Sequence, residues 1–573
     1  MPLMWLAEQE WFFREQGCFS QPREQDIPAG PPCIRRVHNG LSETVDGPSK
    51  SGTGGNMYHS LIEVLEYRAR FSPDRMALQG GAEATYGELK ALSVRMAGQL
   101  RSMGFEPGDR VGLLAFNDAA AIQLLLGSAY AGVIPVILNW RLSREETDFI
   151  LEDANCNTVF VGKDFLPLVA DSGRRVEEMP VGFWSSESTE SSIQDAWELP
   201  GRDQTFLQLY TSGTTSRPKG VPMSHANVMA LLEQLRLEVP SFGFGSVNLV
   251  CAPFFHIAGI GILSLGILGG ATNVIVPRFE PGAVIDAIQT HRISHGLMVP
   301  AMQQAVINHP DAEKADFSSL KHLVYGASPI SRPLLEAAHA RFQCDYTQAY
   351  GLTETTGVAT ILSVQDHLDI LGKESASTIA QGKSPKSDKS SSAGKAAAGI
   401  EIQIRSEGKI CEAGQTGEVF IRGATVVDSY WNRPDENRES FDNGWFASGD
   451  IGYLDDEGYL FLMDRKNDLI ISKGEKIYPI EVERFLAEHP DINDVSVVGI
   501  PDDEYGEAVC AFIVANRKFD VQELRVWQPD GLAQYKRPRR LEHIDVLPRN
   551  PSGKVLRRQL REPFWAGEGR SIH

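Results

Sequence analysis

Cysteine is scarce in this sequence and its spacing is irregular. Only seven of the 573 residues are cysteine, an odd number, and no two of them form a Cys-x-x-Cys pair. Disulfide frameworks need cysteines in pairs, and structural zinc sites need closely spaced cysteines or histidines. The sequence therefore predicts neither, and it favours a reducing compartment, so we expect a cytoplasmic protein.

Positive charge is also in short supply. The chain has 55 Lys and Arg residues against 75 Asp and Glu residues, which gives a formal net charge of −20. Proteins that bind nucleic acids usually carry an excess of basic residues, so this balance argues against a nucleic-acid partner. Any anionic substrate must be held by local positive charge rather than by the field of the whole protein.

The start of the chain lacks the features of a secretory signal, because Glu8, Glu10 and Glu15 interrupt it and no apolar core follows. One segment, residues 252–277, contains no Asp, Glu, Lys or Arg and is long enough to cross a bilayer. Five glycines interrupt it, so we expect a buried helix followed by a strand rather than an integral membrane span.

The length of the chain predicts two or more domains. Residues 1–56 combine aromatic patches with a Gly/Pro/Ser-rich stretch and form, we expect, a partly disordered extension that either docks on a surface or stays a tail. From residue 58 helical and strand patterns alternate, with strands predicted at 110–116 and 132–137 and a helix at 122–130. This alternation predicts a mostly parallel sheet covered by helices.

The strongest chemical signal is the stretch 210–220, Tyr-Thr-Ser-Gly-Thr-Thr-Ser-Arg-Pro-Lys-Gly, which follows an apolar run. Glycine lets successive backbone N–H groups converge on an anion, the hydroxyls add donors, and the lysine adds positive charge. The pattern predicts a strand that leads into a phosphate-binding loop. It differs from the P-loop of nucleotide kinases, in which Ser or Thr follows Gly-Lys at once, because Val221 follows Gly220 here. The expected phosphate-binding residues are Thr211, Ser212, Gly213, Thr214, Thr215 and Lys219.

Five further motifs follow the phosphate loop. They lie at 252–259 (Ala-Pro-Phe-Phe-His-Ile-Ala-Gly), 348–354 (Gln-Ala-Tyr-Gly-Leu-Thr-Glu), 445–450 (Trp-Phe-Ala-Ser-Gly-Asp), 462–479, and 547–554 (Leu-Pro-Arg-Asn-Pro-Ser-Gly-Lys). From about residue 57 to its end the chain resembles the adenylate-forming superfamily, which includes acyl-CoA synthetases, luciferases and the adenylation domains of peptide synthetases. The resemblance is to its acyl-CoA synthetase members of the fatty-acid-CoA ligase type.

The resemblance implies an α/β fold in two parts. Residues 57–463 would form a large AMP-binding domain of layered, mostly parallel sheets and helices. Residues 464–573 would form a small, mobile α+β domain, with a hinge at Asp464.

The resemblance also assigns roles to the motif residues. Gln348, Tyr350 and Gly351 would border the adenine, with Tyr350 stacked on it, and the turn at Gly326 and Ala327 would lie against the adenine and the substrate. Thr353 would contact phosphate or carboxylate. Glu354 would ligate Mg²⁺; the structural alternative is a charge that only stabilises the start of a helix.

Further roles fall on residues nearer the C-terminus. Asp450 would accept the ribose hydroxyls, unless it only caps backbone N–H groups at a turn. Arg465 would reach the ribose or a phosphate. Lys554 would be the adenylating lysine, catalytic together with Glu354 and Lys219.

The substrate side is less specific. His256 would border the acid or gate its channel, but a histidine beside aromatic residues is more often simply packed, and the glycine-rich segment after it suits a channel or a core equally. Gly474 and Lys473 would lie where coenzyme A approaches. Residues 372–398, rich in Ser, Lys, Gly and Ala, are predicted to be a solvated surface loop.

These features favour an ATP-dependent acid–thiol ligase that uses ATP, Mg²⁺ and coenzyme A, with a medium- or long-chain fatty acid as the preferred substrate. One alternative is a ligase that delivers the acyl group to a separate carrier protein. A second, non-enzymatic alternative is a degraded ATP-binding scaffold. The sequence leaves the oligomeric state open, a homodimer included.

Overall fold

The computed structural model describes most of the chain after residue 57. The described residues are 58–184, 199–211, 217–239, 241–372, 389–465, 468–472, 475–502, 505–527, 532–549 and 555–565. The N-terminal extension predicted for residues 1–56 lies outside them.

One sheet contains the strand that leads into the predicted phosphate loop. Its order is β6-β5-β3-β4-β7-β8, and its strands are parallel except at the β7–β8 edge. Strands β4 and β5 are buried along their whole length, as expected in a parallel sheet covered on both faces. The predicted strands at 110–116 and 132–137 are confirmed as β3 and β4. The bounds are β3 (Arg110–Leu114), β4 (Ile134–Ile137), β5 (Thr158–Val161), β6 (Arg175–Glu178), β7 (Thr205–Thr211) and β8 (Lys219–Ser224).

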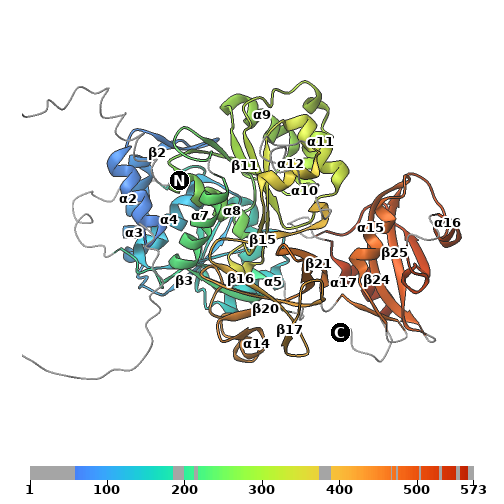
Figure 1. Cartoon of the computed structure of the whole chain (residues 1–573). Coiled ribbons are helices and arrows are strands. Elements are labelled where there is room, and N and C mark those ends of the chain that lie inside the picture. The colour runs from blue at the N-terminus through green and yellow to red at the C-terminus, as the bar shows by residue number, and fades with distance from the viewer. Residues whose placement is uncertain are drawn as a thin grey trace, which may run out of the picture. The chain divides into compact units, whose positions relative to one another are not determined.

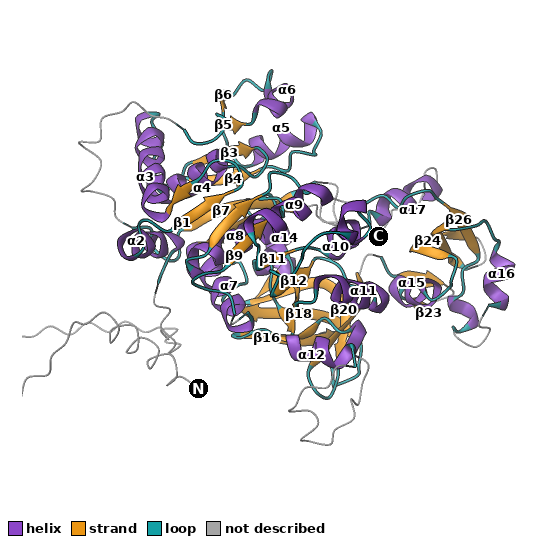
Figure 2. Cartoon of the chain, turned by 90° about the horizontal axis from the view of Figure 1, so that it is seen from above, coloured by secondary structure: helices purple, strands orange, loops and turns teal. Residues whose placement is uncertain are grey.

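The second sheet is larger and mixed. Its order in the described part of the chain is β17-β16-β18-β20-β21-β15-β14-β13-β12-β11-β9-β10-β1-β2, with β19 paired to β20. Neighbours from β13 to β1 are parallel, and those from β17 to β13 are antiparallel. Figure 2 shows strands of both sheets in orange with helices in purple around them. The bounds are β1 (Met76–Gln79), β2 (Ala84–Thr85), β9 (Val247–Val250), β10 (Thr272–Ile275), β11 (His295–Leu297), β12 (His322–Gly326), β13 (Asp345–Tyr350), β14 (Thr360–Leu362), β15 (Gly394–Ala396), β16 (Ile400–Ser406), β17 (Lys409–Ile410), β18 (Gly417–Gly423), β19 (Phe441–Asp442), β20 (Trp445–Leu454) and β21 (Tyr459–Arg465).

Helices pack on these sheets and begin at side-chain caps. Thr85 and Ser143 each form a capping box with the glutamate three residues later, which satisfies N–H groups left open at a helix start. Helices α2, α3 and α4 lie side by side (Figure 1), and α4 is buried throughout, which confirms the predicted helix at 122–130. The bounds are α2 (Leu61–Phe71), α3 (Tyr86–Ser102), α4 (Ala119–Ala131), α5 (Arg144–Asp153), α6 (Leu166–Val169), α7 (His225–Glu238), α8 (Ile257–Gly269), α9 (Pro281–His291), α10 (Pro300–Ile307), α11 (Arg332–Phe342), α12 (Val364–Ile370) and α14 (Pro434–Ser440).

The long segment without charged residues folds as predicted, into the buried helix α8 followed by the strand β10. Gly266 shows why α8 contains glycine: a Cβ atom there would lie only 1.8 Å from Oδ1 of Asn273 on β10. No helix in the described part of the chain is long and apolar enough to cross a membrane.

The predicted surface loop at 372–398 is partly wrong. Residues 389–398 contain a short 3-10 helix, Lys389–Ser391, and the strand β15, which lies between β14 and β21 inside the larger sheet. Gly394 permits this position, because its φ is +93° and a Cβ atom would lie 2.1 Å from the backbone of Ile361. Residues 373–388 lie outside the description.

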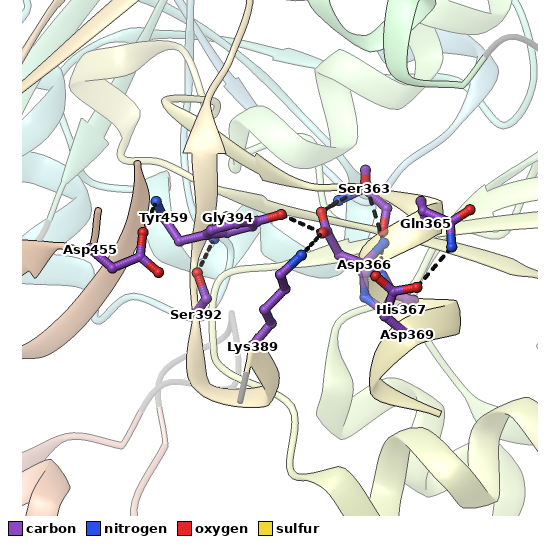
Figure 3. A network of polar contacts seen from close by, with 10 residues as sticks. All are labelled: Ser363, Gln365, Asp366, His367, Asp369, Lys389, Ser392, Gly394, Asp455 and Tyr459. Carbon is purple, nitrogen blue, oxygen red and sulfur yellow. Dashed lines mark hydrogen bonds and ion pairs between the residues drawn. The ribbon is translucent and has the colours of Figure 1, made fainter. Parts of the chain in front are cut away.

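A partly buried polar network joins α12 to strand β21 and to the 3-10 helix that precedes β15 (Figure 3). The Asp366 carboxylate accepts hydrogen bonds from Tyr459 Oη at 2.6 Å and from Lys389 Nζ at 3.0 Å, and Ser363 Oγ donates to its other oxygen at 2.7 Å. Burial opposes the charge of Asp366, but these hydrogen bonds outweigh it and lower the pKa of the carboxyl. The network therefore stabilises the fold only while Asp366 is ionised.

Asp366→Asn is expected to destabilise the protein by about 2–3 kcal/mol at pH 7, since it removes the charge that four donors satisfy, the Ser363 N–H among them. The folded-state pKa lies below the unfolded value of about 4, so this stabilisation is complete above pH 4 and is lost as the pH falls through the folded-state pKa. Urea titrations of both proteins between pH 7 and pH 3.5 measure the difference. A difference that stays constant over this range would contradict the assignment.

The last part of the chain forms a separate small sheet, described here by itself. Its order is β23-β22-β25-β24, with β26 beside β25, and α15 packs on β24 through buried Val482 and Leu486. In the sequence, the pattern of residues 481–489 predicts a helix and the apolar runs at 495–499 and 508–514 predict two strands; these are confirmed as α15, β24 and β25, with somewhat different ends. The bounds are β22 (Ile470–Ser472), β23 (Glu475–Ile477), β24 (Ile492–Asp502), β25 (Gly506–Ala515), β26 (Arg540–His543), α15 (Pro479–Ala487), α16 (Val521–Val526) and α17 (Arg557–Trp565).

Candidate active site

Two predicted motifs meet at the carboxyl ends of neighbouring parallel strands, where open α/β sheets bind ligands. Gly326, the last residue of β12, pairs with Ala349 near the end of β13. A Cβ atom at Gly326 would lie 2.3 Å from the Ala349 carbonyl oxygen, so only glycine permits this approach. The next residue, Ala327, has a φ of +65°, which turns the chain sharply beside the 348–354 motif.

Gly326→Ala is expected to lower the free energy of unfolding by about 1–3 kcal/mol, because the added methyl group must push β12 away from β13. Chemical denaturation measures this loss. Gly243→Ala is the matched control, since a methyl group there would meet no atom within 4 Å. Equal stability of the two variants would show that the strand contact is not needed.

Tyr350 and Asp450, the predicted adenine and ribose residues, are in direct contact. Tyr350 Oη donates a hydrogen bond of 2.6 Å to Oδ2 of Asp450. Asp450 lies within the long strand β20 rather than at a simple turn, and its register partner on β21 is Arg465. Ser448 fixes this part of β20, because its hydroxyl donates to the Val419 carbonyl oxygen and accepts from the Asp450 N–H. The backbones of Asp450 and Arg465 are thus neighbours, as the ribose assignment needs.

Gln348 is held by a buried tyrosine, Tyr325, to which the sequence assigned no role. Tyr325 Oη donates to Oε1 of Gln348 at 3.0 Å and lies 2.8 Å from Nε2 of His367 on α12. Burial lowers the pKa of His367 to about 4, so the imidazole is neutral at pH 7. The Gln348 side chain is therefore fixed by a chain of hydrogen bonds that begins outside the nucleotide motifs.

Lys219 and Glu354 both contact the side chain of Tyr430. Tyr430 Oη donates a hydrogen bond of 2.8 Å to Oε1 of Glu354, and the Lys219 ammonium lies 4.9 Å from the centroid of the Tyr430 ring. Glu354 belongs to a short 3-10 helix, Thr353–Thr355, that follows β13 directly. The structure thus brings the expected metal ligand close to the lysine of the phosphate loop.

Two residues at this site, Tyr430 and its neighbour Trp431, were not predicted from the sequence. Trp431 N–H donates to the Gly220 carbonyl oxygen at 2.8 Å, and its Nε1 donates to the Asp153 carbonyl oxygen at 2.9 Å. The only signal in the sequence is an aromatic pair before Asn-Arg-Pro in a connection between β18 and α14. That signal alone would not have placed these residues at a nucleotide site.

The two ends of the predicted phosphate loop are adjacent, since Thr211 on β7 pairs with Lys219 on β8. Residues 212–216 lie outside the description, so the predictions for Ser212, Gly213, Thr214 and Thr215 are untested by it. The same holds for Lys473, Gly474 and Lys554, and for the side chains of Asp464 and Arg465.

His256 is the N-cap residue that immediately precedes helix α8, and its ring centroid lies 4.8 Å from that of Phe255. Its Nε2 is buried and lacks a hydrogen-bond partner in the described part of the chain. Burial, reinforced by Arg141, lowers the pKa of His256 to about 4, so the side chain is neutral at pH 7. In helix α8, which follows His256, a Cβ atom at Gly259 or Gly266 would clash with neighbouring atoms. These close contacts favour a packed core over an acyl channel for the glycine-rich segment.

A metal here would have mixed ligands. In the described part of the chain, no group of three or more His, Cys, Asp or Glu side chains could hold an ion. The predicted site instead supplies one carboxylate oxygen, from Glu354, and leaves the remaining positions to phosphate and water oxygens. Mg²⁺ accepts such a set readily, so the residues present fit this ion.

Comparisons with known families place the chain in a class of nucleotide-binding enzymes. A model of the AMP-binding enzymes matches residues 65–431, and a model of the AMP-binding enzyme C-terminal domain matches residues 481–554. The chain belongs to the adenylate-forming superfamily of AMP-binding enzymes, whose members here are ligases of acyl groups with coenzyme A or a carrier protein.

Individual relatives match over nearly their whole length. A fatty acid–acyl-carrier-protein ligase of Streptomyces coeruleorubidus is 34% identical over 90% of this chain and 98% of its own. A long-chain-fatty-acid–CoA ligase of Mycobacterium tuberculosis is 32% identical over 88% and 98%. The solved structure of o-succinylbenzoate coenzyme A synthetase from Bacillus subtilis, in complex with ATP and magnesium ion, is similar with a TM-score of 0.73 and 32% identity over 87% and 98%.

Proposed function

We propose that this protein is an ATP-dependent acid–thiol ligase that activates a carboxylic acid as acyl-AMP and then transfers the acyl group to coenzyme A. The observation that carries the proposal is that Lys219 and Glu354 both contact Tyr430. Glu354 follows Tyr350 by four residues in the sequence, and Tyr350 is hydrogen-bonded to Asp450. One end of this site suits phosphates and a metal ion, and the other suits a nucleoside.

In the first step an oxygen of the acid attacks the α-phosphorus of ATP, and pyrophosphate leaves. Two anions are pushed together, so the reaction needs positive charge more than it needs a general base. Lys219 supplies one charge from the start of β8, and we propose that Lys554 supplies another. When bound at Glu354, Mg²⁺ would neutralise phosphate oxygens.

In the second step the thiol of coenzyme A attacks the acyl carbon, and AMP leaves with its bonding electrons. AMP is a stabilised leaving group, whereas the free acid would have to expel oxide. We propose that the small domain, residues 464–573, turns about Asp464 between the steps, moves Lys554 away and brings Lys473 and Gly474 to the thiol. Gly326, Ala327, Gln348, Gly351 and Thr353 would keep the adenylate in place throughout.

The preferred acid is proposed to be a medium- or long-chain fatty acid. Two of the relatives named above act on fatty acids according to their names, and the third acts on o-succinylbenzoate. The glycine-rich helix α8, which first suggested an acyl channel, adds no support because its glycines serve close packing. The cytoplasmic location also remains a prediction.

A carrier protein is the serious alternative acceptor, because a relative at 34% identity carries that acceptor in its name. Thioester formation measured with a panel of short, medium, long and aromatic acids, with coenzyme A or a phosphopantetheinylated carrier protein as acceptor, separates the two. We expect acyl-CoA with medium or long acids. If thioester forms only on the carrier protein, the carrier protein and not coenzyme A is the acceptor. If the protein binds ATP but forms no product with any acid, the result favours the non-enzymatic ATP-binding scaffold.

A further inference from the structure

Tyr430 contacts both charged groups of the site. It contacts the carboxylate of Glu354 with its hydroxyl and the ammonium of Lys219 with its ring. All three side chains are buried, with 7% of Tyr430, 7% of Glu354 and 9% of Lys219 exposed to solvent. A buried cation and a buried anion attract each other strongly, yet among the described residues Lys219 and Glu354 form no ion pair with each other, and both contact the neutral Tyr430 side chain instead.

A direct ion pair would be unsuitable for the proposed reaction. If Lys219 closed on Glu354, each charge would neutralise the other, and neither would be available to phosphate or metal. A cation over an aromatic face keeps its full charge while gaining a modest electrostatic attraction. The Lys219 ammonium lies on the Tyr430 ring in this way, and no carboxylate pairs with it in the described part of the chain.

The hydroxyl has a second effect, on the carboxylate. A carboxylate can rotate about its Cγ–Cδ bond, and the hydrogen bond from Tyr430 to Oε1 fixes that rotation. A metal site with one protein oxygen depends on this orientation, because Mg²⁺ demands near-ideal octahedral geometry. Groups that orient a metal ligand commonly change metal affinity by about 10- to 100-fold when they are removed.

The backbone around Tyr430 is tied to the same two elements that carry the charged groups. Val427 N–H donates to the Glu354 carbonyl oxygen at 2.9 Å, and Trp431 N–H donates to the Gly220 carbonyl oxygen at 2.8 Å. The N–H of Tyr430 itself donates to Oδ1 of Asn437 at 2.7 Å. The segment 427–431 is therefore hydrogen-bonded both to Glu354 in its 3-10 helix and to Gly220 at the end of the phosphate loop. Tyr430 cannot shift without moving both of these elements.

We propose that Tyr430 is a positioning residue of the adenylation site: its hydroxyl orients Glu354 for Mg²⁺, and its ring holds the Lys219 ammonium apart from Glu354 and toward the phosphates. This inference rests on the proposed function, because it presumes that the site binds ATP with Mg²⁺. It assigns two separable tasks to one side chain, which substitutions can test one at a time.

The test is calorimetric binding of ATP to the full-length protein, with and without Mg²⁺. Tyr430→Phe keeps the ring, so ATP binding in EDTA should match the wild type, while the tightening caused by Mg²⁺ should fall about 10-fold. Tyr430→Leu also removes the ring, so ATP binding in EDTA should itself weaken about 3- to 10-fold. In a Glu354→Gln background, Tyr430→Phe should have no further effect on the Mg²⁺ dependence.

Tyr67→Phe is the matched control, because Tyr67 lies on α2 with an exposed side chain. If the Mg²⁺ dependence of Tyr430→Phe equals that of the wild type, the inference is overturned while the proposed function stands. If the wild type itself fails to bind ATP with Mg²⁺, the proposed function fails instead. The Tyr430→Phe result decides the inference alone should the leucine variant not fold.

Discussion

Lys554→Ala should reduce acid-dependent adenylation by about 10²- to 10³-fold, the loss expected when a pre-placed cation is removed from a phosphoryl-transfer site. The same variant should still convert a supplied acyl-adenylate to the thioester, because the second step involves no attack on phosphorus. The two half-reactions are measured separately, by pyrophosphate release without coenzyme A and by acyl-CoA formation from synthetic acyl-AMP.

Lys518→Ala serves as the control for Lys554→Ala. Lys518 lies in the same small domain with an exposed side chain, and it belongs to none of the motifs. Its removal should leave both half-reactions unchanged. A Lys554→Ala protein in which both half-reactions fall equally would contradict the assignment of this lysine to the first step alone.

Glu354→Gln should reduce adenylation by about 10²-fold or more at a fixed Mg²⁺ concentration, and part of the loss should be recovered as Mg²⁺ is raised. The amide keeps the shape of the side chain and can still accept the hydrogen bond from Tyr430, so the main change is the missing charge. Pyrophosphate release titrated with Mg²⁺ measures both effects.

Glu457→Gln is the matched control for Glu354→Gln, because Glu457 is exposed in the connection between β20 and β21. The unfolding midpoint of each variant without ligand shows whether the fold is intact. If Glu354→Gln lowered activity with an unchanged Mg²⁺ requirement, Glu354 would be a structural residue at the start of its short helix rather than a metal ligand.

Much of the fold could be predicted from the sequence, where local pattern and packing agree. Strands β3 and β4 are apolar runs buried on both sides, and their composition alone identifies them. The segment 252–277 was also predicted correctly, because its glycines distinguish a packed helix from a membrane span. The motif residues of β12, β13 and β20 lie in contact with one another, and their roles in nucleotide binding stay predictions.

The parts that could not be predicted depend on contacts between distant segments. Strand β15 contains Gly394 and Lys395 and has the composition of a loop, and it is a strand only because β14 and β21 supply hydrogen bonds on both sides. Tyr430 is separated from Glu354 by 76 residues in the sequence. Its role became visible only when the fold placed it against both Glu354 and Lys219.

The most direct test of the adenylation account is exchange of labelled pyrophosphate into ATP by the wild-type protein without coenzyme A. The account predicts exchange that requires both Mg²⁺ and a carboxylic acid, since only reversible formation of acyl-AMP returns pyrophosphate to ATP. Absence of exchange with every acid of the panel, from a protein that binds ATP with Mg²⁺, would contradict it.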